Sequence, residues 1–485
     1  MATNNQLSKT DLLLEKVRSG GADMTGYEQI SLTARLAIPA ILAQISHVLM
    51  EYIDAAMVGR LGAEGAASIG LVATTTWLFW GVCSSIATGF SVQVAHKIGA
   101  RKDKDARSIL RQAFTTTLAF SLTLCLIACS ISGHLPGWLG GEESIRSGAS
   151  DYFLVFALTI PFFELNVLMS SMLRCSGNVK VPSMLNMLMC VLDVVFNFLF
   201  IFPTTEYHLL GMDIKIYGAG LGVMGAALGT ATAEVIICSL LFYFLCFRSR
   251  KMSLFGRLSR EKAKFQLFKP TGRVVKKAVK LGLPIACERV IMCGAQICTT
   301  MIVAPLGMFA IAANAFGVNA ESLCYMPGYG IADAATTLVG QSVGAKRHDL
   351  AWRFAKITVV MGMAIMALMG VVMYVGAPLM MRIMTPVPEI VELGVDALRI
   401  EAFAEPLFAA SIVCYGVFVG AGKTVVPSCM NFGSIWAFRI PLSLILAPTM
   451  GLNGVWLAMC IELCIRGLLF LWRLKSKKWL PKEDI

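Results

Sequence analysis

The sequence is poor in charged residues. Only 15% of its 485 residues are Asp, Glu, Lys or Arg, whereas soluble domains usually carry about 25%. Hydrophobic residues make up 56% of the chain, and the mean hydropathy is +0.70. This composition excludes a disordered chain, which requires low hydrophobicity. It favours one polytopic membrane protein over a chain of several soluble domains.

The sequence also lacks the motifs of metal sites and disulfide frameworks. Its 15 cysteines form no C-x-x-C pair, and its five histidines do not cluster, so neither a zinc site nor a set of disulfides is expected. No H-E-x-x-H motif supports an intramembrane metalloenzyme. We therefore expect no enzymatic activity, no cofactor and no bound metal. The polar first 31 residues do not resemble a cleavable signal peptide.

Long apolar runs are what the sequence has in abundance. A helix needs ~20 mostly apolar residues to cross the hydrocarbon core of a bilayer. By this measure the sequence predicts twelve transmembrane helices. They cover residues 32–58, 66–95, 107–132, 150–173, 180–203, 218–247, 276–304, 307–340, 353–377, 392–420, 425–447 and 452–472.

The basic residues indicate how these helices are oriented. Lys and Arg concentrate in alternate loops, which is typical of loops on the cytoplasmic side. The loop residues are Lys97, Arg101, Lys102, Lys104, Arg107, Arg174, Lys180, Lys346, Arg347 and Lys423. We expect a multi-pass protein of the plasma (inner) membrane with both termini in the cytoplasm. The densest basic stretch, 248–280, is interpreted as a linker facing anionic lipid of the bilayer and not as a nucleic-acid site.

The two halves of the chain share landmarks at a constant spacing of 245 residues. The matched pairs are Pro39 and Pro284, Gly62 and Gly307, Gly99 and Gly344, Gly177 and Gly422, Pro182 and Pro427, and Asn186 and Asn431. Each half contains six predicted helices, so both halves enter the membrane in the same direction. The sequence therefore predicts an all-α polytopic membrane protein of two parallel six-helix repeats, an architecture of transporters.

This repeat divides the chain into five predicted parts. A cytoplasmic N-terminal segment (1–31) precedes an N-lobe (32–247). A basic cytoplasmic linker (248–275) joins it to a C-lobe (276–473), and a cytoplasmic tail (474–485) follows.

Ionisable residues inside the N-lobe spans indicate a polar site. A charge at the centre of a membrane helix costs ~2.5–3.5 kcal/mol on insertion scales, so such residues are functional candidates. On the first helix, His47, Glu51 and Asp54 fall on one stripe at 100° per residue. Asp193 and Asn197 on the fifth helix are spaced i, i+4 and share a face.

The sixth helix repeats this spacing with Thr230 and Glu234. Counted from the span ends, Asp54, Asn197 and Thr230 all fall in the outer half of the bilayer. We expect them to converge with Asp193 on one polar pocket of the N-lobe. The alternative is that a neighbouring polar group satisfies each acid separately.

The C-lobe also carries charges within its predicted spans, namely Glu288, Arg289, Glu321, Asp333, Arg439, Glu462 and Arg466. We expect Glu288, Arg289 and Arg439 to neutralise one another or their partners inside the lobe. The candidate residues of a substrate cavity are His47, Glu234, Glu288, Arg289, Glu321 and Arg439.

Several sequence segments together resemble one transporter family. They are "YIDAAMVGRLG" (52–62), "LRCSGNVKVPSMLNMLMCVLDVVFNFLFIF" (173–202), "GVMGAALGT" (222–230), "PIACERV" (284–290) and "ESLCYMPGYGIADAATTLVGQSVGAKR" (321–347). The sequence is similar to the multidrug and toxic compound extrusion (MATE) family of secondary transporters, and within it to the DinF-like branch.

The resemblance implies roles for the N-lobe residues. In MATE transporters an acid at the place of Asp54 couples transport to a cation, together with an Asn/Asp couple on the fifth helix and a Thr on the sixth. Here the couple is reversed, with Asp193 before Asn197. The NorM-like sodium ligands of the C-lobe would fall at Met292 and Phe408, which bind cations poorly. The expected coupling ion is therefore H+, with Na+ as the alternative.

The function implied is a secondary antiporter that exports amphipathic, cationic organic compounds as a monomer, with protonation of Asp54 as the switch. The alternative within the superfamily is a flippase of lipid-linked oligosaccharides or polysaccharides. A flippase needs a cationic central cavity, so the directions of Arg289 and Arg439 discriminate between the two. A passive channel is disfavoured by the two-lobe repeat.

Overall fold

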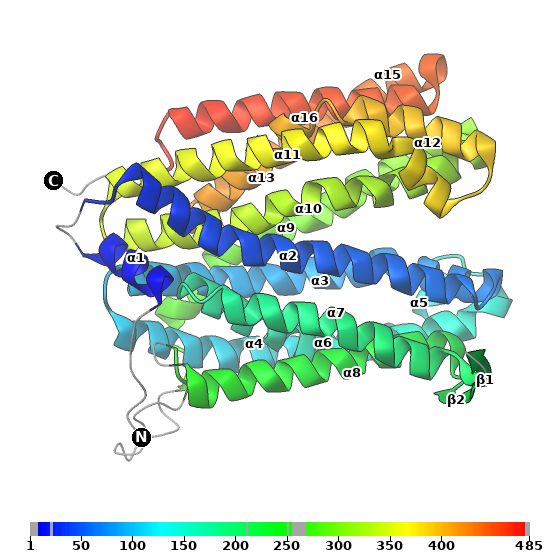
Figure 1. Ribbon diagram of the computed structural model, residues 1–485, viewed down its shortest axis with the longest axis horizontal. Helices are drawn as coiled ribbons and strands as arrows, with labels where there is room; N and C mark the ends of the chain where they lie inside the picture. The colour runs from blue at the N-terminus through cyan, green and yellow to red at the C-terminus, as the bar shows by residue number, and fades with distance from the viewer. Residues whose placement is uncertain (1–7, 20–22, 210–211, 250–251, 255–267, 481–485) are drawn as a thin grey trace.

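The computed structural model describes residues 8–19, 23–209, 212–249, 252–254 and 268–480. Its long helices lie along a common axis and form one elongated bundle (Figure 1). Helix α1 and the last turns of the final helix, α16, lie at one end of this bundle, which we call the terminal face. The strands β1 and β2 lie at the opposite end, the far face (Figure 1).

The N-terminal half contains eight helices and a β-hairpin. Its elements are α1 (Lys9–Arg18), α2 (Gly26–Gly59), α3 (Ala63–Gly99), α4 (Asp103–Ile131), α5 (Leu135–Trp138), α6 (Glu143–Cys175), α7 (Lys180–Ile201), β1 (Pro203–Leu209), β2 (Met212–Ala219) and α8 (Gly222–Tyr243). A π-helical turn, η1 (Phe244–Arg248), continues α8.

The C-terminal half repeats this order without the hairpin. Its elements are α9 (Gly272–Val303), η4 (Ala304–Leu306), α10 (Met308–Gly344), α11 (His348–Met384), α12 (Pro388–Glu401), α13 (Glu405–Gly420), α14 (Val425–Ser434), η5 (Ile435–Arg439), α15 (Ile440–Met450) and α16 (Leu452–Lys475). Three of these form one continuous path, because the π-helical turn η5 joins α14 to α15.

Each of the twelve predicted spans coincides for most of its length with a helix or with consecutive helices, although 180–203 and 218–247 each include an end of the β-hairpin. Ten helical stretches of the described chain are long and apolar enough to cross a membrane, and an eleventh span is the pair α12 and α13, bent by 62°. The twelfth predicted span is α10, which has 37 residues but does not reach the same mean hydropathy. Small and polar residues replace large apolar ones along α10, because much of it is buried inside the bundle.

The backbone repeats the 245-residue spacing of the sequence. Gly62 and Gly307 precede α3 and α10 with φ angles of +90° and +103°. Arg101 and Lys346, also 245 residues apart, follow those helices with φ angles of +57° and +59°. The same unusual conformations at equivalent positions show that the two halves have the same local fold.

Two features of the structure differ from the sequence expectation. Residues 203–219 form an antiparallel hairpin in which Tyr207 pairs with Ile214, whereas the sequence predicted no strand between the spans 180–203 and 218–247. The predicted N-terminal segment also contains α1, whose residues Leu13, Leu14 and Val17 are buried. Much of the basic linker, including 255–267, lies outside the described residues.

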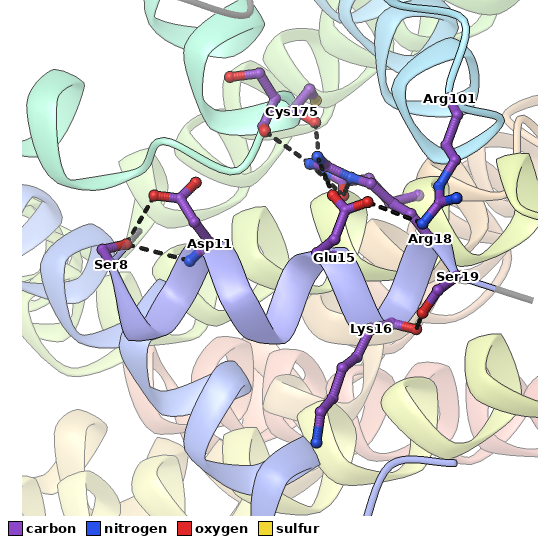
Figure 2. A network of polar contacts seen from close by, with 10 residues as sticks. Ser8, Asp11, Glu15, Lys16, Arg18, Ser19, Arg101 and Cys175 are labelled. Atoms are coloured by element: carbon purple, nitrogen blue, oxygen red, sulfur yellow. Dashed lines mark hydrogen bonds and ion pairs between the residues drawn. The ribbon is translucent and has the colours of Figure 1, made fainter. Parts of the chain in front are cut away.

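Helix α1 contacts both halves at the terminal face, and Figure 2 shows its polar side chains there. Ser8 caps the helix by accepting a hydrogen bond from the Asp11 amide at 3.1 Å. Toward the N-terminal half, Glu15 forms a 2.8 Å ion pair with Arg101, which follows α3. Arg18 is buried and donates to the Ser176 carbonyl at 3.3 Å.

The same arginine reaches the C-terminal half. Arg18 Nε and Nη2 donate to Oε1 of Gln341 on α10, at 3.2 and 3.1 Å. Arg347, next to α11, donates to the carbonyls of Lys16 and Ser19 at 3.2 Å. Helix α1 therefore bridges the two halves at the terminal face.

Candidate functional site

The polar pocket of the N-terminal half is organised by one asparagine. The Asn197 amide on α7 donates to Asp54 Oδ1 on α2 at 2.9 Å and to Asp193 Oδ2, one turn earlier on α7, at 3.0 Å. Asp193 and Asn197 are 0% and 1% exposed, and Asp54 is partly buried. Two carboxylates from two helices therefore meet at one amide group.

A glycine on the neighbouring helix makes room for this asparagine. Gly229 of α8 lies so close to α7 that a Cβ atom at this position would overlap Asn197 Oδ1 and come within 2.7 Å of the Asn197 backbone nitrogen. The Asn197 Oδ1 atom has no hydrogen-bond partner in the described part of the chain. The amide is thus oriented with its NH2 group toward the two acids.

The other predicted members of this pocket surround the pair. Thr230 of α8 interacts with Asp193, and Glu51 lies within electrostatic reach of Asp54. His47 Nε2 is 3.7 Å from Glu51 Oε1. The structure therefore brings together the residues that the sequence predicted to converge.

An aromatic stack adjoins this stripe. The His47 ring is stacked on Trp80 of α3 at 5.5 Å between centroids, and Trp80 is stacked on Phe163 of α6 at 4.7 Å. Sequence reasoning did not find this stack, because its three members are on different helices at unrelated spacings.

Two further acids are buried in the N-terminal half. Glu234 accepts a hydrogen bond from the Asn166 amide of α6 at 2.8 Å. Glu164, also on α6, is 0% exposed, and neither of its carboxylate oxygens has a hydrogen-bond partner among the described residues. Sequence reasoning missed Glu164, although an acid within an apolar helix was the signal used for the others.

In the C-terminal half, Glu288 is held by neutral donors. Tyr415 and Ser428 donate to its Oε2 atom at 2.6 and 2.8 Å, and Asn431 donates to Oε1 at 2.6 Å. These donors come from α13 and α14, so the carboxylate of α9 ties three helices together. Glu288 is therefore stabilised by hydroxyl and amide groups, whereas the sequence predicted charge neutralisation.

Arg439 is paired with a different acid. Its guanidinium donates to Glu462 Oε2 at 3.1 and 2.8 Å, and Arg466 donates to the same oxygen at 2.9 Å. Ser434 donates to the other carboxylate oxygen of Glu462. Glu321 of α10 lies within electrostatic reach of both arginines. The prediction that Arg439 is neutralised inside the lobe agrees with this cluster.

Two more acids of the C-terminal half were not identified from the sequence. Glu401 and Glu405 lie at the bend between α12 and α13, are each 1% exposed, and have no hydrogen-bond partner among the described residues.

A central cavity of about 190 Å³ lies between the two halves. Its walls come from α3 and α6 on one side and from α9, α10, α13, α14 and α16 on the other. Of the predicted cavity residues, Glu288 and Arg289 line it, whereas His47, Glu234, Glu321 and Arg439 are not among its lining residues. His47 and Glu234 belong instead to the N-terminal half, and Arg439 is held by Glu462.

The fold and the buried site together indicate the class of protein. It is a multi-pass helical membrane protein of two equivalent halves, with a cavity between them and a buried acid pair in one half. The MatE family model matches this chain twice, over residues 39–199 and again over residues 284–445. The chain therefore belongs to the MATE family of efflux transporters, and the two matches coincide with the two repeats.

Curated relatives match nearly the full length. The "Probable multidrug resistance protein NorM" of Thermotoga maritima is 26% identical over 460 residues, with 92% of each chain covered. The "Uncharacterized transporter YisQ" of Bacillus subtilis is 23% identical over 450 residues, covering 92% of this chain and 94% of the relative. The DinF-like branch stays a prediction, because these relatives carry other names.

Solved structures share the fold. A MATE crystallised in complex with MaL6 superposes with a TM-score of 0.85 at 20% identity, covering 98% of this chain and 100% of that one. A MOP superfamily transporter from Pyrococcus furiosus superposes with a TM-score of 0.84 at 19% identity and the same coverage. Membership of a family of transporters is consistent with the prediction that the chain is not an enzyme.

Proposed function

We propose that this protein is a secondary active multidrug antiporter that exports amphipathic organic compounds in exchange for inward H+. The observation that carries the proposal is the Asn197 amide, which joins Asp54 of α2 to Asp193 of α7. Because the two acids come from different helices, a change in their charge alters the force between those helices. The names of the NorM relatives support drug export and do not favour the flippase alternative.

A proton suits this pocket better than Na+ does. A proton requires one carboxylate, whereas a hard cation requires several oxygen ligands around it. The Asn197 side chain presents its NH2 group to both acids, which directs a positive end of the amide dipole into the space between them. In the described part of the chain, no group of three acids, histidines or cysteines is arranged to hold a metal ion.

We further propose that the terminal face is cytoplasmic and that the protein lies in the inner membrane. The predicted basic loop residues Lys97, Arg101 and Lys102 lie near the end of α3 at this face, in agreement with the excess of basic residues on cytoplasmic sides. The two halves correspond to the predicted N-lobe (32–247) and C-lobe (276–473). We propose that the protein acts as a monomer.

The central cavity is the proposed binding site for exported compounds. It is closed toward the terminal face by contacts between the lobes, among them the 3.3 Å ion pair of Arg174 with Asp333 and the 2.8 Å hydrogen bond from Gln341 to the Cys175 carbonyl. Protonation of the Asp54 pair would reshape the N-lobe and so alter the wall that α3 and α6 contribute.

The test uses purified protein in proteoliposomes and a panel of amphipathic fluorescent dyes that includes cationic, neutral and anionic members. A pH gradient and a Na+ gradient are imposed separately. We expect the pH gradient alone to drive movement of at least one dye, and Asp54→Asn to abolish that movement while dye binding is retained.

The matched control is Asp151→Asn, which removes an exposed carboxylate from α6 and should leave transport unchanged. Transport driven only by Na+ and lost in Asp54→Asn would keep the pocket but replace the ion. Full transport in Asp54→Asn would remove Asp54 from coupling.

A further inference from the structure

Five charged side chains line the central cavity, and they are not equally available to a ligand. They are Arg174, Glu288, Arg289, Asp333 and Arg466. Charged groups that already have partners contribute little to recognition, because their hydrogen-bonding atoms are occupied. The chemistry of the cavity therefore depends on which of these five side chains remains open.

The two acids of the cavity wall are already occupied. Glu288 accepts hydrogen bonds at both carboxylate oxygens, from Tyr415, Ser428 and Asn431. Asp333 is paired with Arg174 at 3.3 Å, across the boundary between the lobes. A cationic ligand would have to displace one of these partners to gain a carboxylate.

Two of the three arginines are paired with acids. Arg174 is held by Asp333, and Arg466 donates to Glu462 while its guanidinium lies 5.7 Å from the centre of the Phe408 ring. Arg289 makes no ion pair with any residue that the structure describes. It has the hydroxyl of Tyr329 as a polar neighbour, and among the three cavity arginines it is the one without a carboxylate partner in the described part of the chain.

Arg289 also lies where both lobes meet. It projects from α9 of the C-lobe against Gly81 of α3 in the N-lobe, where an added Cβ atom would be 2.9 Å from the Arg289 Cβ. The wall of the same cavity also contains the apolar side chains of Met292, Phe408 and Ile412. A positively charged guanidinium beside an apolar wall suits a compound that has an anionic group at one end and a hydrophobic body.

We propose that the central cavity takes amphipathic organic anions, whose carboxylate, sulfonate or phosphate group is bound by the Arg289 guanidinium. The planar guanidinium can donate two parallel hydrogen bonds to such a group. This assignment rests on the proposed function, since it makes the cavity the transport site. It differs from the cationic substrates that the sequence predicts, because the sequence does not reveal that Glu288 is occupied by three donors.

Three naphthalene compounds of different charge provide the test: 1-naphthaleneacetate, 1-naphthaleneethanol and (1-naphthylmethyl)trimethylammonium. Their binding to the full-length protein in lipid nanodiscs is measured by isothermal titration calorimetry. We expect the carboxylate to bind at least about tenfold more tightly than the alcohol, and the ammonium compound to bind no more tightly than the alcohol.

Variants identify the residue responsible. Arg289→Gln should remove the preference for the carboxylate, whereas Arg289→Lys should keep part of it, because Lys retains the charge without the planar fork. Arg382→Gln, which removes an exposed arginine at the end of α11, should change nothing. The order of the three affinities in the unmodified protein tests the proposal even if a variant does not fold.

Tighter binding of the ammonium compound by the unmodified protein would overturn the proposal, and so would an unchanged carboxylate preference in folded Arg289→Gln. The dye experiment separates this result from the proposed function. Carboxylate binding without transport on any gradient would refute antiport alone, whereas transport of cationic dyes without carboxylate binding would refute only the anion assignment.

Discussion

His96 and Gln341 occupy equivalent positions in the two repeats and make equivalent contacts across the lobe boundary. His96 Nε2 lies 2.8 Å from the Gly420 carbonyl, and Gln341 Nε2 donates to the Cys175 carbonyl at 2.8 Å. Gln341 is 245 positions after His96, and Gly420 is 245 positions after Cys175, so the two hydrogen bonds are related by the internal repeat. The terminal face is therefore closed by a pseudo-symmetric pair of contacts between the end of one lobe's second long helix and the other lobe.

Two glycines permit this closure. A Cβ atom at Gly99 of α3 would overlap the Gln341 carbonyl, and one at Gly344 of α10 would overlap the His96 carbonyl. We predict that Gly99→Ala and Gly344→Ala each destabilise the closed terminal face by about 1–3 kcal/mol, the usual effect of overpacking. Thermal unfolding of the purified protein, followed by tryptophan fluorescence, measures the change.

Gly70→Ala is the control for these variants. Gly70 lies on α3 as well, but nothing is within 4 Å of a Cβ atom at this position, so the variant should be neutral or slightly stabilising. Equal melting temperatures for Gly99→Ala and Gly70→Ala would contradict the close-packing explanation.

Helix α1 provides a second prediction, because Arg18 bonds to the oxygen of the same Gln341 side chain. Arg18→Ala removes one side chain that bonds to both lobes, through the Ser176 carbonyl and Gln341, and leaves Leu14 and Val17 in place. We expect faster opening of the terminal face, measured as faster modification of a cysteine placed at Ala95, which is buried beside Gly340.

Arg18→Lys should show an intermediate rate, since it keeps one charged donor but loses the second hydrogen bond to Gln341. Leu12→Ala, at an exposed position of the same helix, should leave the rate unchanged. The bridging role is refuted if Arg18→Ala and Leu12→Ala react at the same rate.

The sequence supported the helices and the N-lobe pocket for a clear physical reason. Apolar runs reflect the bilayer, which acts on each helix separately. Asp54, Asp193 and Asn197 are polar residues that such helices rarely contain. The partners of the C-lobe charges could not be predicted from the sequence in this way. Glu288 is bound by residues about 130 to 140 positions later in the chain, and no local pattern indicates those contacts.

Helix α1 and the hairpin escaped prediction because each is short. Lys9–Arg18 has ten residues, and its buried face becomes evident only when α10 is placed beside it. Leu13 and Leu14, four and three residues before Val17, were the available signal of an amphipathic helix.

The position of Asn197 can be tested without changing any charge. Gly229→Ala places a Cβ atom where Asn197 Oδ1 now lies, which should push the amide away from Asp54 and Asp193. We predict that dye transport driven by a pH gradient falls at least tenfold, an effect of about 1.4 kcal/mol on coupling. Gly70→Ala again serves as the control, and normal transport by Gly229→Ala would show that the amide contact is dispensable.

The orientation of the bundle can be tested by labelling two sites on opposite faces. Lys102→Cys lies next to α4 at the terminal face, and Tyr217→Cys lies on β2 at the far face, where Tyr217 is 74% exposed. In intact cells, a membrane-impermeant maleimide should label Tyr217→Cys and not Lys102→Cys. Labelling in the reverse pattern would invert the proposed topology.

The cluster around Glu462 gives the last prediction. One fully buried carboxylate accepts hydrogen bonds from Arg439, Arg466 and Ser434. Glu462→Gln would leave two guanidinium groups close together with less negative charge between them, and removing one partner of a buried ion pair costs about 3–5 kcal/mol. We therefore expect poor yield and a strongly lowered melting temperature for Glu462→Gln, whereas Glu392→Gln, at an exposed position of α12, should behave normally. Restoring stability by combining Glu462→Gln with Arg439→Gln would show that the excess positive charge is the cause, because that double variant removes one charge of each sign.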